Sequence, residues 1–336
     1  MDPRIRGLVS LAALLAASSA AAAGADEANK GCADQNPQVA IIACSVLIES
    51  GTEPAANLSR EYNNRGGAYG ATGDFDRAIQ DFEQAIRLDH ENFGAFINRG
   101  NTYQAQRQYD RALEDYNEAI RIKPGESRAF GARAGIYELL GQRDRALIDY
   151  DHAIMLDGSN VGALVNRGQV YLGQRDFDRA IADFDEAIKA EPNFAPAFDS
   201  RGVAYARMAQ YDRALENYNQ AVKLNPHSAV ALFHRAVNYE RLGDLNRAIL
   251  DFSRTLELVP DDADLLVARG NAFQAQHDYP HAIGDYDDAI MLDAKNSRAF
   301  FNRGMAKRSS GDEAGAQADF SKAQSLDPSL AQQAPP

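Results

Sequence analysis

Two histidines that lie four residues apart, His277 and His281, have a spacing that suits a metal pair. Such a pair needs a continuous helix, whereas Pro280 and a predicted turn separate these two residues. The chain also lacks a Gly-rich phosphate loop, a Cys-x-x-Cys pair and a Ser in a nucleophile-elbow context. Acidic pairs such as Asp149 and Asp151 recur because the sequence repeats, and solvation explains them. The sequence therefore predicts a protein that is not an enzyme and that holds no metal and no cofactor.

The two cysteines, Cys32 and Cys44, are the other residues with chemical potential. In an oxidising compartment thiols this close in sequence pair, and the resulting loop closure would stabilise the fold by about 3 kcal/mol. We expect a disulfide if the chain is exported. The alternative is two free buried thiols.

The N-terminus indicates export. Arg4 and Arg6 precede an apolar stretch over residues 8–17, and an alanine run to Ala23 offers small-x-small cleavage sites. We interpret residues 1–23 as a cleaved signal peptide, so that the mature protein is soluble and periplasmic or secreted. The alternatives are an Ala-rich helix docked on the protein or an uncleaved anchor, although the apolar stretch is too short for a membrane span. No direct membrane insertion is expected.

The charge of the chain argues against nucleic acid as a partner. The formal net charge is −13, and Lys and Arg are spread at fixed positions beside acids instead of forming a basic stripe. The acidic surface is explained by solubility.

Arginine recurs every 34 residues without insertion or deletion, which places eight repeats over residues 59–330. The column consists of Arg65, Arg99, Arg133, Arg167, Arg201, Arg235, Arg269 and Arg303. A small residue follows each arginine, as two closely crossing helices require, and an aromatic residue stands three positions further on in seven repeats. The eighth repeat has Lys307 there instead.

The second half of each repeat has Ala, an aromatic residue four positions later and a small residue three beyond that, which is helical spacing. Glycines such as Gly73 mark the turn between the halves, and prolines such as Pro124 mark the repeat ends. Each repeat is therefore predicted to be helix, turn, helix, turn.

This pattern resembles the tetratricopeptide repeat. The motif of that family matches the second repeat at Phe96, Gly100, Tyr103, Ala112, Tyr116, Ala119 and Pro124. The resemblance covers about four-fifths of the chain and implies an all-α fold: a right-handed superhelical solenoid whose first helices (A) line a concave groove and whose second helices (B) lie behind them. One departure is systematic, because this chain has Arg where the family often has Leu.

A column that is Asp in seven repeats and Asn in the fifth accompanies the arginines and stands one residue before the aromatic residue of each predicted B helix. We expect each Arg to pair with its acid inside the stack, because a partly buried guanidinium needs a bidentate carboxylate to offset its desolvation. The column consists of Asp81, Asp115, Asp149, Asp183, Asn217, Asp251, Asp285 and Asp319.

The two ends of the repeat array need covers. Residues 24–58 do not fit the period, but residues 39–48 have an apolar face like that of a B helix, so we expect an N-terminal cap held by the disulfide. The eighth repeat is predicted to cap the other end, and residues 331–336 are predicted to be a disordered tail.

The predicted groove surface is rich in amides. The position directly before the column arginine holds Asn64, Asn98, Asn166, His234 and Asn302 in five of the repeats. Further amides follow the arginines at Asn101, Gln104, Gln169, Asn271 and Gln274. An amide can bond the backbone of an extended peptide through both its ends. The interleaved apolar residues Ile97, Val165, Phe233, Val267 and Phe301 are predicted to take ligand side chains. The alternative is that the amides only brace neighbouring repeats.

These features favour a non-catalytic scaffold of the cell envelope that binds a peptide segment or a partner subunit. A second hypothesis is a structural protein that self-associates through its repeats.

Overall fold

The structure is a computed structural model that describes residues 28–332 of the chain. The predicted signal peptide, residues 1–23, lies outside the described residues. Across residues 28–332 no helix combines the length and the apolar content that crossing a membrane requires. The chain divides into two compact units at Asn166 and Arg167.

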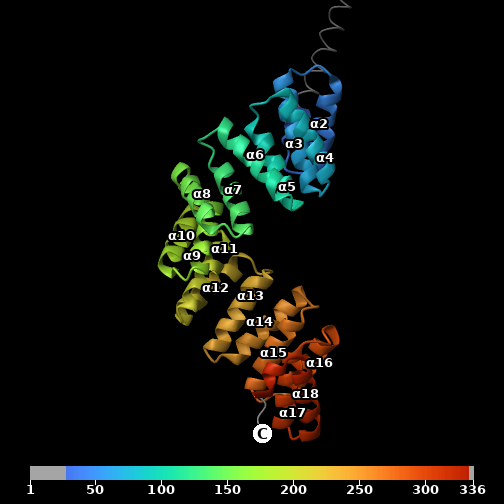
Figure 1. Cartoon of the computed structure of the whole chain (residues 1–336), viewed down its shortest axis with the longest axis vertical. Coiled ribbons are helices and arrows are strands. Elements are labelled where there is room, and N and C mark those ends of the chain that lie inside the picture. Colours follow the sequence, from blue (N-terminus) through green and yellow to red (C-terminus); the bar gives the residue numbers. More distant parts are fainter. Residues whose placement is uncertain (1–27, 333–336) are drawn as a thin grey trace, which may run out of the picture. The chain divides into compact units, whose positions relative to one another are not determined.

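Between residues 37 and 166 the first unit contains seven complete helices and the start of an eighth, which Figure 1 shows in blue to green. They are α2 (Pro37–Ser50), α3 (Ala55–Ala71), α4 (Phe75–Leu88), α5 (Phe93–Ala105), α6 (Tyr109–Ile122), α7 (Ser127–Leu139), α8 (Arg143–Leu156) and α9 (Val161–Gly173).

The second unit contains the rest of α9, nine further α-helices and a terminal 3₁₀ helix. They are α10 (Phe177–Ala190), α11 (Ala195–Arg207), α12 (Tyr211–Leu224), α13 (Ala229–Arg241), α14 (Leu245–Leu258), α15 (Ala263–Ala275), α16 (Tyr279–Leu292), α17 (Ser297–Ser309), α18 (Glu313–Leu326) and η1 (Pro328–Gln332).

The predicted all-α fold of helix-turn-helix repeats is confirmed: from α3 to α18 the helices alternate between A and B positions. Each turn is made in the same way. The residue at the turn has a positive φ in every repeat, and it is a glycine in four of them, such as Gly73. The other four are Arg107, Arg175, Ala209 and His277. An aspartate often caps the B helix that follows, as Asp74 does by accepting a bond from the backbone N–H of Arg77.

The small residue after each arginine sets the closest contact between the A and B helices. A Cβ at Gly100 would lie 2.7 Å from the ring of Tyr116, and one at Gly168 would lie 2.6 Å from the ring of Phe184. Both rings are fully buried. The aromatic ring of helix B therefore fills the space that the missing side chain of helix A leaves.

Helix α2 takes the place of a B helix ahead of the first repeat. Arg65 Nη1 donates to Ser45 Oγ of α2 at 3.0 Å, just as Arg133 Nη1 donates to Asn117 of the preceding B helix, α6, at 2.7 Å. The buried face of α2 consists of Ala40, Cys44 and Leu47. A disulfide joins Cys44 to Cys32, which lies in the helical stretch that the described residues 28–32 form.

The C-terminal end is covered as well. In η1, Leu330 is 8% exposed and clusters with Phe300 and Ala323 of the eighth repeat. This helix runs to Gln332, two residues into the segment 331–336 that the sequence predicts to be a loose tail. Residues 333–336 lie outside the described part of the chain.

Candidate functional site

The arginine column is bound inside the repeats. Arg65 donates from Nε and Nη2 to the two carboxylate oxygens of Asp81 at 2.7 and 2.8 Å. The same bidentate geometry joins Arg99 to Asp115, Arg133 to Asp149, Arg167 to Asp183, Arg235 to Asp251, Arg269 to Asp285 and Arg303 to Asp319. The hydrogen bonds to Asp81 raise the pKa of Arg65 against the opposing effect of burial. These guanidinium groups are thus structural.

Two repeats differ in the residues around this arrangement, in ways that keep the charges matched. In the fifth repeat Asn217 replaces the aspartate, and Arg201 bonds both Asn217 and Asp185. In the eighth repeat Lys307 replaces the aromatic residue, and its Nζ lies 2.9 Å from Asp319. Burial raises the pKa of Asp319, but Arg303 and Lys307 together hold it below its usual range.

Several of the predicted groove residues connect successive A helices. Asn98 Nδ2 donates to Asn63 Oδ1 at 2.9 Å, and Asn302 Nδ2 donates to Asn271 Oδ1 at 2.8 Å. His234 Nδ1 lies 3.0 Å from a carboxylate oxygen of Asp199. The bracing role that the sequence left open is present at these positions.

Other predicted amides serve a buried phenol. The hydroxyl of Tyr116 donates to Asn101 at 2.7 Å and approaches Gln104 at 3.2 Å. In the seventh repeat Tyr286 makes the equivalent contacts with Asn271 and Gln274 at 2.8 and 3.2 Å. Burial raises the pKa of both tyrosines, so the phenols stay protonated and act as donors.

The fourth repeat contributes two predicted residues, one on each side of the division between the units. Asn166 is exposed and hydrogen-bonds Tyr150 of the preceding B helix within the first unit. Gln169 is also exposed, and the ring of its own repeat, Phe184, has no hydroxyl to engage it.

The prediction that five apolar residues of the groove take ligand side chains is wrong at three of the five positions. Ile97 and Val165 are each 5% exposed and Val267 is 6% exposed, so no ligand side chain can reach them. They pack into the cores of their repeats, because this face of helix A turns toward neighbouring helices. Phe233 and Phe301 remain partly exposed.

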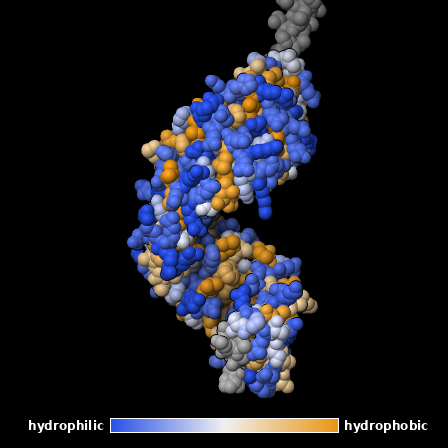
Figure 2. All heavy atoms as spheres, in the orientation of Figure 1, coloured by the Kyte–Doolittle hydropathy of each residue, from blue (hydrophilic) through white to orange (hydrophobic). Residues whose placement is uncertain are grey.

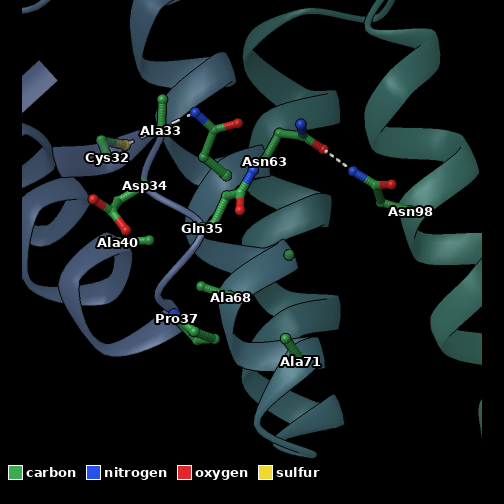
Figure 3. Close-up of a pocket in the computed structure, with 12 residues that line it drawn as sticks. Cys32, Ala33, Asp34, Gln35, Pro37, Ala40, Asn63, Ala68, Ala71 and Asn98 are labelled. Atoms are coloured by element: carbon green, nitrogen blue, oxygen red, sulfur yellow. Dashed lines mark hydrogen bonds between the residues drawn. The ribbon is translucent and has the colours of Figure 1, made fainter. Parts of the chain in front are cut away.

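Two hollows open over α3 and α5 in the first unit. One, of about 270 Å³, is lined by Asn63, Asn64, Asn98, Cys32 and Pro37 among others. Figure 3 shows Asn63 and Asn98 beside it. The other, of about 260 Å³, is lined by Gly70, Phe75, Asn101 and Thr102. Gly67 and Asn98 line both hollows, so the two adjoin. Together they define the α3–α5 groove.

The sequence prediction missed two polar residues that contact a following A helix, Asn63 on α3 and Asp199 on α11. Both stand two positions before the column arginine, where the other repeats have Ile97, Gly131, Val165, Phe233, Val267 and Phe301. Polar residues within a mostly apolar column were the available signal.

The two histidines with metal-pair spacing turn to separate partners. His281 Nδ1 lies 2.8 Å from Asp278, and His277 Nδ1 lies 3.0 Å from the hydroxyl of Tyr279. Among residues 28–332 no group of three or more potential metal-ligating side chains occurs.

Comparison with known proteins agrees with this architecture. Two sequence profiles of the tetratricopeptide repeat match the chain, one over residues 59–92, 94–126 and 161–194 and the other over 200–263 and 267–331. The matched segments cover more than half of the chain. The third repeat falls outside them, yet it folds into α7 and α8 with the same Arg133–Asp149 pair. No functionally curated protein matches the chain.

Solved structures show the same fold. A tetratricopeptide repeat protein from Parabacteroides merdae is 21% identical, covers 74% of this chain and 99% of its own length, and superposes with a TM-score of 0.54. PilF from Pseudomonas aeruginosa is 18% identical, covers 63% of this chain and 96% of its own length, and superposes with a TM-score of 0.57. At this identity the likeness concerns the fold alone. The repeat geometry and the profile matches together show that the chain belongs to the tetratricopeptide-repeat family, whose members are typically non-catalytic scaffolds for protein interaction.

Proposed function

We propose that this protein binds an extended segment of a partner protein in the α3–α5 groove. The observation that carries the proposal is the pair of adjoining hollows, which share Gly67 and Asn98 and are walled by amides. Small residues such as Ala68 and Ala71 line the first of these hollows, so a peptide backbone can approach the helices closely (Figure 3).

The amides that wall the groove retain hydrogen-bonding capacity. The bond between Asn98 and Asn63 uses one donor of Asn98 and one acceptor of Asn63. The carbonyl of Asn98 and the NH₂ group of Asn63 remain to pair with the N–H and C=O groups of a peptide. Such contacts give affinity through the backbone and demand little of the ligand's sequence.

We further propose that the protein acts in the cell envelope after removal of residues 1–23. The N-terminal pattern supports this location, and so does the Cys32–Cys44 disulfide, since disulfides persist mainly in oxidising compartments. A fusion of residues 1–30 to a reporter enzyme that is active only after export tests the location. An inactive reporter would contradict the proposed location in the cell envelope.

The groove is tested by filling it. A Cβ at Gly67 would meet no atom within 4 Å, so Gly67→Leu places a side chain in the groove without a clash in the fold. We expect this variant to lose specific partners in crosslinking pull-downs from native envelope extract. Gly284→Leu on α16 is the matched control, because a Cβ there also meets open space. Recovery of the same proteins with both variants would exclude the α3–α5 groove as the binding site.

Self-association is a second candidate, and α2 favours it. Val39, Ile42 and Val46 form an exposed apolar stripe on this helix, with exposures of 41%, 67% and 56%. Glu49 is the only charged residue of α2, so two copies of an acidic chain could meet here with little repulsion. Sedimentation of the wild type and of Ile42→Lys decides the matter: concentration-independent monomers of the wild type would reject this candidate.

A further inference from the structure

A separate apolar hollow lies in the second unit, between α13, the end of α14 and the start of α15. It has a volume of about 380 Å³, and Val230, Phe233, Val259 and Leu265 supply apolar lining. Val230 is 59% exposed and Val259 is 41% exposed. Figure 2 shows hydrophobic side chains at the surface over α13. Apolar side chains at the rim of an apolar hollow are typical of a docking site.

The other repeats show that the helical hairpin does not need these apolar residues. At the position of Val259, the residue that follows each B helix, the other seven repeats have Asp89, Lys123, Asp157, Glu191, Asn225, Asp293 and Asp327. At the position of Val230 they have Arg60, Gly94, Arg128, Gly162, Pro196, Asp264 and Arg298. Every repeat but this one therefore places a polar, small or ring-closed residue where the sixth repeat exposes a valine.

The bottom of the hollow behaves as an apolar surface. Thr255 stands where the other repeats have Ala, and its hydroxyl donates to the backbone carbonyl of Asp251 at 2.8 Å. Leu265 is 4% exposed and stands where most repeats have Ala. The hydroxyl is already paired, so methyl groups and the Phe233 ring make the apolar part of the hollow, beside the polar lining residues His234, Asp262 and Asp264.

The rim of the hollow is acidic. Residues 257–264 contain Glu257, Asp261, Asp262 and Asp264 and no basic residue. Asp262 and Asp264 line the hollow itself. Asp262 caps α15 through one oxygen, and Asp264 forms an ion pair with Arg298 in which both side chains are about 70% exposed. An exposed pair of this kind contributes little, so Asp264 can exchange Arg298 for a cation of a ligand.

We propose that this hollow is a second docking site, independent of the α3–α5 groove, for a protein segment with one bulky apolar side chain flanked by lysine or arginine. The apolar side chain enters between Val230 and Val259 and covers Phe233. The flanking cations face Asp262 and Asp264. Apolar burial supplies the affinity, and the acidic rim selects against acidic segments.

The test uses three fluorescein-labelled peptides on the full mature chain: phenylalanine between two pairs of lysines, serine between the same lysines, and phenylalanine between two pairs of glutamates. Fluorescence anisotropy should show binding of the first peptide and at least about tenfold weaker binding of the other two, which corresponds to ~1.4 kcal/mol. Equal binding of all three, or binding of none, would overturn the proposal.

Two variants locate the binding. Val259→Asp and Val230→Arg introduce the residues that several other repeats already carry at these positions, so the fold should tolerate both. Each should weaken binding of the first peptide about tenfold or more, by the loss of apolar burial. Met291→Arg is the control, because it removes an apolar residue that is 79% exposed and lies outside the hollow. Equal loss of binding in the control, at unchanged helicity, would show that the peptide binds elsewhere.

Discussion

At the level of single residues, the repeats meet the same structural requirement with different residue types. The turn between helices A and B requires a positive φ in all eight repeats, and four repeats meet it without glycine. The Arg–Asp pairs place charges in a nearly buried layer and leave the two members dependent on each other. Glu61 is buried where the other repeats have Ala or Leu.

Replacement of Ala209 by glycine should stabilise the protein. Ala209 has a φ of 56°, a left-handed conformation that strains any residue with a Cβ. We expect Ala209→Gly to raise the free energy of unfolding by about 0.5–1 kcal/mol, after the larger entropy of glycine in the unfolded chain is subtracted. Urea denaturation followed by circular dichroism measures this. Gly73→Ala, at a φ of 81°, should have the opposite sign, and a shared sign would refute the argument from φ.

Removal of both members of an Arg–Asp pair should be milder than removal of one. The Asp115 side chain is 6% exposed and accepts two bonds from Arg99, so Arg99→Leu leaves a buried carboxylate alone. Each single change to Leu should destabilise the protein by about 3–5 kcal/mol, and the double change by much less. A double-mutant cycle in urea provides the measurement. Additive losses would mean that the pair does not act as a unit.

Glu61 should make stability depend on pH. It is 1% exposed, and within the described residues neither carboxylate oxygen has a hydrogen-bond partner. Burial, with a smaller effect of Glu53, raises its pKa above the ordinary 4.5, although Arg60 opposes this. The folded state thus holds the proton more tightly than the unfolded state. The stability that this group contributes is present below pH 4.5 and is lost as the pH rises through the raised pKa.

Glu61→Ala should therefore stabilise the protein by about 1–3 kcal/mol at pH 7.5 and by much less at pH 4. Hydrogen exchange of α3 amides at the two pH values gives the measurement. Glu49→Ala, at an exposed position of α2, is the control and should change little at either pH. An equal gain from Glu61→Ala at both pH values would show that ionisation of Glu61 is not involved.

At the level of secondary structure elements, α2 extends the repeat pattern beyond the part that the period reveals. Ser45 on α2 receives the bond from Arg65 that Asn117 and Ser253 receive from the arginines of later repeats. What differs is the partner of α2. Its described partner is the helical stretch that residues 28–32 form, and a disulfide joins the two.

Reduction of the disulfide should release this N-terminal element alone. A cross-link that closes a loop this short contributes about 3 kcal/mol, in addition to the apolar burial of Ala40 and Leu47 on α2. We expect amide protection over residues 28–50 to fall with dithiothreitol while protection of α13–α16 is unchanged. A Cys32→Ser/Cys44→Ser variant should show the reduced pattern with or without dithiothreitol. Undiminished protection of α2 after reduction would mean that packing on α3 suffices.

At the level of the whole molecule, the main helix contacts within each unit join neighbours in chain order or successive A helices. Such a protein is stabilised by the sum of its repeats and of the interfaces between them. A feature that serves only the interface can therefore be changed in one repeat without loss of the fold. The sixth repeat shows this freedom, because its exposed valines replace polar, small or ring-closed residues in an otherwise standard helical hairpin.

The sequence by itself determined the period, the helix-turn-helix repeat and the Arg–Asp partners, because each depends on residues within one repeat. Asp115 stands 16 residues after Arg99, and Tyr116 stands 16 residues after Gly100. This spacing along the chain is the same in every repeat. The antiparallel packing of the two helices within one repeat, α5 on α6 in this case, brings such residues together. The pairing of Cys32 with Cys44 has the same local character.

Only the tertiary structure decided which polar residues brace the stack and where it is hollow. Asn98 meets Asn63 and His234 meets Asp199 across 35 residues, at an interface between A helices that no pattern within one repeat encodes. The same interface buries Ile97 and Val267, which the sequence had placed in the groove. The physical reason is that the angle and spacing of successive repeats fix these contacts, and both follow from packing in three dimensions.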